Sequence, residues 1–156
     1  MADTTLVRDV MSTPVSTLQP HVKVEEAADV LAEKNVGALP VVDAEGKLLG
    51  ILRDDDLIAS EARVHVPTFI NFLGLGMAFP GEMKHLEYEL KKIAGATVAD
   101  VMQTDPPTVT EDATLEDVAT IMHERGVNSL PVVDTNDKVV GIVARADLVR
   151  FIARTT

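Results

Sequence analysis

The chain carries one pattern of 52 residues twice, and this duplication limits its possible folds more than any other feature of the sequence. Residues 7–58 align with residues 98–149 at a constant offset of 91 positions and without a gap, and 20 of the 52 aligned pairs are identical. Self-similarity at a fixed offset indicates a repeated structural unit whose copies share a buried core. Any function should therefore depend on what the two copies form together.

Both copies predict the same order of elements. Residues 36–43 and 48–52, and their counterparts 127–134 and 139–143, are short Val/Ile/Leu-rich runs bounded by Pro, Gly and Asp, which is typical of buried strands. An extended Pro-containing stretch and an amphipathic helix precede each strand pair, and a second helix follows it. The sequence therefore predicts the α/β (α+β) class, with two β-α-β-β-α repeats packed sheet to sheet about a pseudo-two-fold axis.

The local signals at helix starts and turns are uneven between the copies. In the second copy Thr114 is the predicted N-cap, and Asp117 stands three residues later in a variant of the capping box. The first copy has Lys23 at the cap position, so we expect its helix start to be weaker by about 1 kcal/mol. The polar loops 43–46 and 134–137 favour hairpin turns with a left-handed residue near the end.

Composition narrows the classes of function. The chain is 46% hydrophobic and 25% charged, as in ordinary globular proteins. A net charge of −11 repels a phosphate backbone, so nucleic acid is not expected as a partner. The chain contains no cysteine, which fits a reducing, cytoplasmic setting. The first residues show no signal peptide, and the apolar segment 69–79 is too short to cross a bilayer, so no membrane association is expected.

No catalytic or metal-binding constellation is visible. The four histidines fall at unrelated positions, none of them in a metal-ligand spacing: His21, His65, His85 and His123. The acidic run 54–56 could suggest a metal site, but it opens a helix, where carboxylates interact favourably with the helix dipole. We therefore predict a protein that is not an enzyme and that needs no metal or cofactor.

The two repeats, predicted at residues 7–62 and 97–154, are separated by a connector at 63–96 with a character of its own. The spacing of its second half predicts an amphipathic helix. The connector also concentrates the aromatic residues of the chain, Phe69, Phe72, Phe79 and Tyr88. If the three phenyl rings stayed in water, each would lose the roughly 1.5–3 kcal/mol of stabilisation that burial provides. We expect the module itself, a second subunit or a partner to cover them.

The spaced signature Asp-Val-Met, Leu-Pro-Val-Val-Asp and Gly-Ile followed by Asp-Leu resembles the CBS domain, present here as the tandem pair often called a Bateman module. The resemblance covers both repeats. It implies a cleft between the repeats that often binds adenosine nucleotides, and a regulatory effect on an attached or associated protein. It also implies a homodimer that associates through the helices 24–35 and 54–63 and their counterparts in the second repeat.

Two aspartates are the central residues of the expected site. Asp147 and Asp56 each lie one turn into a helix, where a carboxylate can accept hydrogen bonds from two adjacent ribose hydroxyls. In proteins that this chain resembles, a Ser or Thr three residues earlier helps to hold the ribose. Here that residue is Ala144 in one copy and Arg53 in the other, so part of the usual polar contact is missing. Arg53 and Arg145 could instead contact a phosphate.

By the same resemblance, the base would lie against the extended segment and first strand of the opposite repeat. For a ligand held by Asp147, these residues are Ser16, Val36, Gly37 and Ala38. For a ligand held by Asp56, they are Pro107, Val127, Asn128 and Ser129. Two interpretations stay open: a regulatory module for an AMP-, ADP- or ATP-like ligand that signals to an unknown protein, or a structural, dimerising module with an empty cleft.

Overall fold

The computed structural model describes residues 5–58 and 96–155. The connector helix and the aromatic residues Phe69, Phe72, Phe79 and Tyr88 lie outside the described residues, and so does most of the predicted connector.

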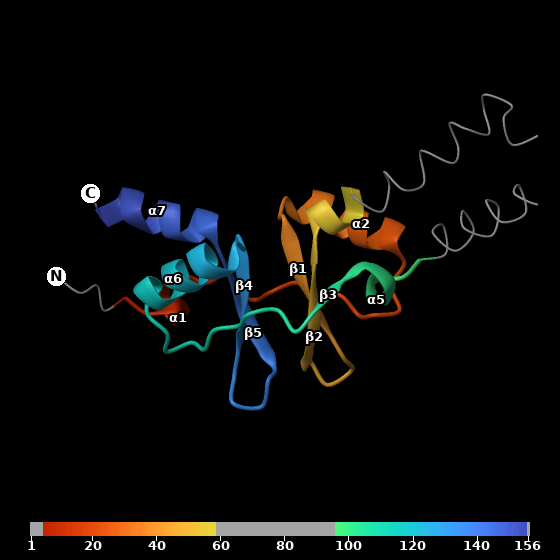
Figure 1. The fold of residues 1–156 in the computed structure, drawn as a ribbon, viewed down its shortest axis with the longest axis horizontal. Coiled ribbons are helices and arrows are strands. Elements are labelled where there is room, and N and C mark those ends of the chain that lie inside the picture. The colour runs from red at the N-terminus through yellow and green to blue at the C-terminus, as the bar shows by residue number, and fades with distance from the viewer. Residues whose placement is uncertain (1–4, 59–95, 156) are drawn as a thin grey trace, which may run out of the picture.

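The described chain forms short helices around two small sheets, in the order expected for a duplicated unit (Figure 1). The first half contains α1 (Val7–Val10), α2 (Val24–Lys34), β1 (Ala38–Val42) and β2 (Leu48–Arg53), followed by helical residues 54–58. The second half contains α5 (Val98–Val101), β3 (Gln103–Thr104), α6 (Leu115–Arg125), β4 (Ser129–Val133), β5 (Val139–Ala144) and α7 (Arg145–Thr155). The mixed helix and strand class predicted from the sequence is confirmed.

The two hairpins are built in the same register. Antiparallel pairing places Ala38 opposite Arg53 in the first and Ser129 opposite Ala144 in the second, so each strand residue has a counterpart 91 positions away. The turns end in left-handed residues, Gly46 at φ 86° and Asp137 at φ 62°. This feature was predicted from the polar loops. The equal register allows any position in one repeat to be compared directly with its counterpart in the other.

The repeats exchange their N-terminal helices, which the sequence did not predict. The Val7 side chain of α1 is part of the hydrophobic core of the second repeat, and its N–H donates to the carbonyl of Ala113 at 2.8 Å. Reciprocally, Val98 of α5 lies in the core of the first repeat and donates to the carbonyl of Val22 at 2.8 Å. Each core is therefore completed by residues from the other half of the chain.

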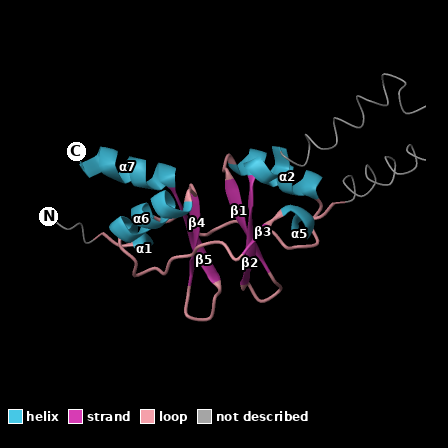
Figure 2. Ribbon diagram, viewed as in Figure 1, coloured by secondary structure: helices cyan, strands magenta, loops and turns pink. Residues whose placement is uncertain are grey.

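The extended segment that comes after each exchanged helix crosses from one repeat to the other (Figure 2). Ser12 pairs with Ile142 of the second hairpin, and six residues later Leu18 pairs in parallel with Val41 of the first. The counterpart segment begins with strand β3, which pairs with β2. Further along, its Val109 pairs with Val132 of β4. The crossing brings residues 13–17 to the boundary between the two repeats.

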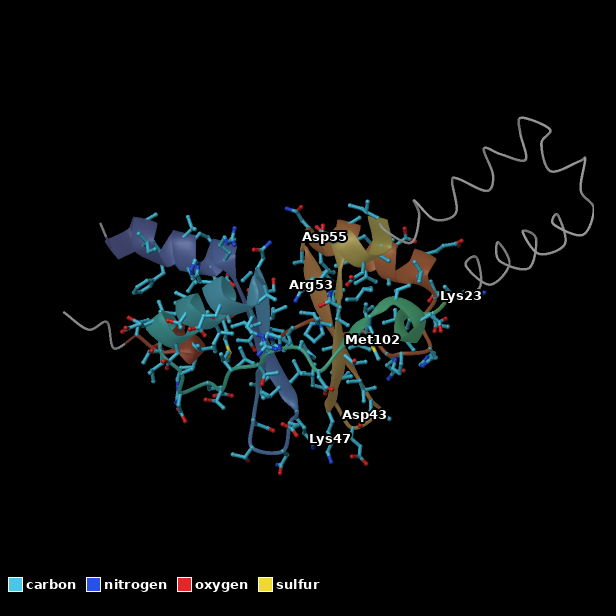
Figure 3. All side chains as sticks on the ribbon, viewed as in Figure 1. Lys23, Asp43, Lys47, Arg53, Asp55 and Met102 are labelled. Atoms are coloured by element: carbon cyan, nitrogen blue, oxygen red, sulfur yellow. The ribbon has the colours of Figure 1, made fainter. Side chains whose placement is uncertain are left out.

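Glycine in the Gly-Ile signature makes room for these crossings. A Cβ atom on Gly50 would lie 2.5 Å from the carbonyl oxygen of Gln103 and 3.0 Å from Sδ of Met102, which lies beside β2 (Figure 3). A Cβ atom on Gly141 would lie 2.6 Å from Sδ of Met11. The shortest distance at each glycine is far below a normal contact, so a side chain at either position would force the crossing segment or the methionine to shift.

The tips of the two hairpins are also joined. Lys47 and Lys138 form an antiparallel bridge, in which Leu48 N–H donates to the carbonyl of Asp137 and Val139 N–H to that of Gly46. The joined tips lie at the bottom of the view in Figure 1, and α2 and α7 lie at the opposite end. The repeats therefore meet closely at their turns.

The helix caps differ as the sequence predicted. Thr114 Oγ1 accepts the N–H of Asp117 at 3.1 Å, and the Asp117 carboxylate accepts the N–H of Thr114 at 3.2 Å. Lys23, at the start of α2, makes no side-chain cap hydrogen bond. The second repeat therefore has a reciprocal capping box that the first lacks.

Replacing Lys23 with threonine is expected to raise the free energy of unfolding by about 1 kcal/mol, because Glu26 already stands where a capping box needs its carboxylate. Urea denaturation measures this change as a higher midpoint at constant slope. The matched control, Thr114→Ala, should lose a similar amount. An unchanged midpoint in Lys23→Thr would mean that the open cap does not limit stability.

Candidate functional site

A pocket of about 420 Å³ lies between the two repeats, within the size range of small-molecule sites. One wall comes from the first half of the chain: Ser12, Pro14, Val15, Ser16, Lys34, Asn35, Val36, Gly37, Ala38 and Leu39. The other wall comes from the second half: Ser129, Ile142, Ala144, Ala146, Asp147 and Arg150. Because both repeats contribute, a molecule in the pocket would contact them at the same time.

The pocket gathers most of the residues that the sequence associated with Asp147. Ser16 arrives on the crossing segment, and residues 36–38 follow the left-handed end of α2 at Asn35, where φ is 54°. Ala144 and Asp147 come from β5 and the first turn of α7. Arg145 is not among the lining residues. It is exposed at the start of α7, and its N–H donates to the carbonyl of Asn128 at 2.8 Å.

Asp147 is a buried carboxylate at the pocket, with only 7% of its surface exposed. Its Oδ2 accepts the N–H of Ala144 at 2.8 Å, and its Oδ1 accepts from the Arg150 guanidinium at 2.5 Å. An ionised carboxylate offers about four lone-pair positions, so two donors leave capacity for more. The side chain is thus held in one orientation while it can still accept hydrogen bonds from a ligand.

The residues associated with Asp56 are not gathered in this pocket, apart from Ser129. Asp56 accepts the N–H of Arg53 at 3.0 Å and the side-chain amide of Gln103 at 3.4 Å. Val127 is 6% exposed and belongs to the core of the second repeat. Pro107 is partly buried and Asn128 is exposed. The two halves of the cleft therefore differ in how their side chains are placed, although the two hairpins have the same register.

Two cations of the pocket, Lys34 and Arg150, were not predicted. Lys34 ends α2, and Arg150 lies one helical turn after Asp147 and pairs with it. The pocket is therefore lined by two cations and one carboxylate, in a chain whose net charge is −11. The i, i+3 spacing from Asp147 could have pointed to Arg150, whereas Lys34 carries no distinguishing signal in the sequence.

Within residues 5–58 and 96–155 there is no cluster of three or more side chains that could ligate a metal ion. The helices of the same ranges include none that is long and apolar enough to cross a membrane.

The fold and the signature identify the family. Residues 7–63 and 98–154 each match the family model of the CBS domain. The chain therefore belongs to the CBS-domain family and carries a pair of these domains, as the resemblance in its sequence indicated.

Individual relatives share this arrangement. The chain is 34% identical over 138 residues to the CBS domain-containing protein CBSX1, chloroplastic, of Arabidopsis thaliana, covering 85% of this chain and 57% of that protein. The chain thus spans little more than half the length of this relative.

Solved structures cover the chain more completely. The crystal structure of CBSX2 from Arabidopsis thaliana in complex with AMP has 29% sequence identity and a TM-score of 0.74, covering 96% of this chain and 97% of that one. The CBS domain pair of protein MJ0100, in complex with 5′-methylthioadenosine and S-adenosyl-L-methionine, has 27% identity and a TM-score of 0.72, covering 99% and 100%. These similarities extend over both repeats of the present chain.

Proposed function

We propose that this protein is a regulatory module, without catalytic activity, that binds an adenosine nucleotide in the cleft between its CBS repeats and signals occupancy to a partner protein. The pocket at Asp147 carries this proposal, because a buried carboxylate from one repeat faces short side chains from the other. AMP, 5′-methylthioadenosine and S-adenosyl-L-methionine bound to similar domain pairs support an adenosine ligand.

In the proposed complex the ribose hydroxyls donate to the Asp147 carboxylate. The adenine lies between Val36 and the crossing segment at Ser16, where an apolar face and backbone polar groups are both available. Ala144 provides a methyl group where the resemblance to the family implies a Ser or Thr, so Asp147 is the main polar contact to the ribose in this proposal. Binding to both repeats favours the arrangement that closes on the ligand, by no more than the difference in affinity between the two arrangements.

The charge of the pocket favours a ligand with a phosphate. Lys34 and Arg150 line it, and the N-terminus of the 11-residue helix α7 begins beside it. Cations and the positive end of a helix dipole stabilise an anion, whereas the sulfonium of S-adenosylmethionine would be repelled. We therefore rank AMP, ADP or ATP above S-adenosylmethionine as the ligand.

Calorimetric titration with AMP, ADP, ATP and S-adenosylmethionine tests the proposed function. We expect saturable heat with at least one phosphate-bearing nucleotide and weaker binding of S-adenosylmethionine. No heat with any of the four, in a folded protein, would favour the alternative of a structural module with an empty cleft, which the missing hydroxyls at Arg53 and Ala144 support.

Removing one pocket cation should separate the phosphate contact from the adenosine contact. Lys34→Ala is expected to weaken AMP binding about five-fold, the effect of losing roughly 1 kcal/mol from a partly exposed ion pair. Binding of 5′-methylthioadenosine, which has no phosphate, should change little. Equal weakening of both ligands in calorimetry would mean that Lys34 acts on the pocket's shape and not on the phosphate.

We also propose that the protein is a homodimer. The helices that follow the hairpins expose apolar side chains at equivalent positions, Ile58 at 66% and Val149 at 58%. Two equivalent apolar positions suit an isologous interface with two-fold symmetry. Light scattering at tens of micromolar should give twice the chain mass, and Val149→Glu should lower it. A monomeric wild-type protein would contradict this proposal.

A further inference from the structure

The two halves of the cleft differ at the residue that ends the second strand of each hairpin. Ala144 ends β5 and lines the pocket beside Asp147. The equivalent residue at the end of β2, beside Asp56, is Arg53. The half of the cleft at Asp56 thus has the long, charged side chain of arginine where the half at Asp147 has a single methyl group.

The Arg53 side chain is partly buried. Its Nε atom is buried and, among the described residues, has no hydrogen-bond partner. An arginine directed to solvent keeps its donors hydrated, so a buried Nε means that the stem of the side chain is packed against other groups. Figure 3 shows Arg53 and Asp55 at the edge of the first repeat that faces the second.

Neighbouring positions also differ in ways that disfavour a nucleotide. Ser12, which lines the pocket at Asp147, corresponds to Gln103, whose Nε2 lies 3.4 Å from Oδ1 of Asp56. Ala146, another lining residue, corresponds to Asp55, a carboxylate with the same sign as a phosphate. Gln103 thus places a longer side chain beside Asp56 than Ser12 provides in the pocket at Asp147, and a second carboxylate is nearby.

The apolar contact for the base is also reduced. Val36 is 41% exposed and lines the pocket, whereas its counterpart Val127 is 6% exposed and belongs to the core of the second repeat. A valine committed to the core offers little surface on which a planar ring could lie.

We infer that Arg53 closes the half of the cleft at Asp56, so that each chain holds one ligand, beside Asp147. This inference rests on the proposed nucleotide binding. A second nucleotide would have to displace the Arg53 stem, separate Gln103 from Asp56 and bring its phosphate close to Asp55. With one site per chain, occupancy follows a simple hyperbola unless the two chains of a dimer are coupled.

Calorimetric stoichiometry with AMP tests the inference. The wild-type protein should bind one AMP per chain. The double variant Arg53→Ala/Asp55→Ala supplies the same residues as positions 144 and 146, and should bind two, the second more weakly. The reciprocal variant Ala144→Arg/Ala146→Asp should bind none. Arg53→Ser is a milder replacement in case the double variant is unstable, and thermal melts confirm that each variant is folded.

The outcomes separate this inference from the proposed function. Two AMP per chain in the wild type, or one in both folded Arg53 variants, would overturn the closing role of Arg53 while leaving nucleotide binding intact. A fall in stoichiometry on replacing Arg53 would mean that Arg53 holds a ligand. No binding in the wild type but one AMP in the double variant would refute the site at Asp147 and retain the role of Arg53. No binding in either protein would overturn both.

Discussion

Replacing Asp147 with alanine is expected to abolish the thermal stabilisation that a nucleotide gives to the protein. At ligand a hundredfold above its dissociation constant, binding to the folded state alone stabilises by about 2.7 kcal/mol. For a chain of this size, that corresponds to a rise of about 5–10 °C in melting temperature. Asp147 is the buried acceptor of the pocket, so its loss removes the proposed ribose contact. Melts with and without AMP measure the difference.

Asp56→Ala is the matched control for this prediction. Asp56 accepts the N–H of Arg53 in the way that Asp147 accepts that of Ala144, so both variants lose the same bond at a helix start. Asp147→Ala also loses the ion pair with Arg150, so each variant is compared with its own melting temperature in the absence of AMP. Only Asp147→Ala should lose most of the AMP-induced shift, and equal losses in the two variants would contradict the assigned asymmetry.

Replacing Gly50 with alanine is expected to lower the free energy of unfolding by about 1–3 kcal/mol, the usual cost of forcing an extra group into a packed site. The new Cβ would lie 2.5 Å from the carbonyl oxygen of Gln103, on a backbone segment that cannot move without breaking its pairing with β2. Gly141→Ala should cost less, because its closest contact is the more adaptable side chain of Met11. Urea denaturation of both variants measures the ranking.

Gly37→Ala provides the control for these strand glycines. Its new Cβ would come no closer than 3.5 Å to another atom, the Oδ2 of Asp54, which is an ordinary contact. Its stability should therefore change by no more than about 0.5 kcal/mol. If all three alanine variants were equally stable, the crossing segments would not depend on glycine at the strands.

The repeats, hairpins and caps were predictable because local patterns specify them. The pairing of Thr114 with Asp117 and the left-handed turn residues follow from a few neighbouring side chains. The exchange of α1 and α5 was not predictable in this way. The two copies have nearly the same apolar pattern, so Val7 and Val98 would bury equally well in either core. Only the path of the segments that follow them decides which core each one enters.

The candidate site was predictable in part. Ser16, residues 36–38 and Asp147 lie together as the resemblance implied, and their role in binding stays a prediction. Arg145 was expected near a phosphate but is exposed and not among the lining residues. Residues two positions apart, such as Arg145 and Asp147, lie on different faces of a helix. Arg150 takes a place in the lining one turn later. The exact direction of each residue at a helix start depends on where the helix begins, which a sequence pattern fixes only to within a residue or two.

A crystal structure of the protein grown with saturating AMP tests the central claim most directly. We expect one nucleotide per chain, with both ribose hydroxyls within hydrogen-bond distance of the Asp147 carboxylate and the adenine between Val36 and Ser16. A nucleotide bound elsewhere, or an empty cleft in crystals that contain AMP, would contradict the account.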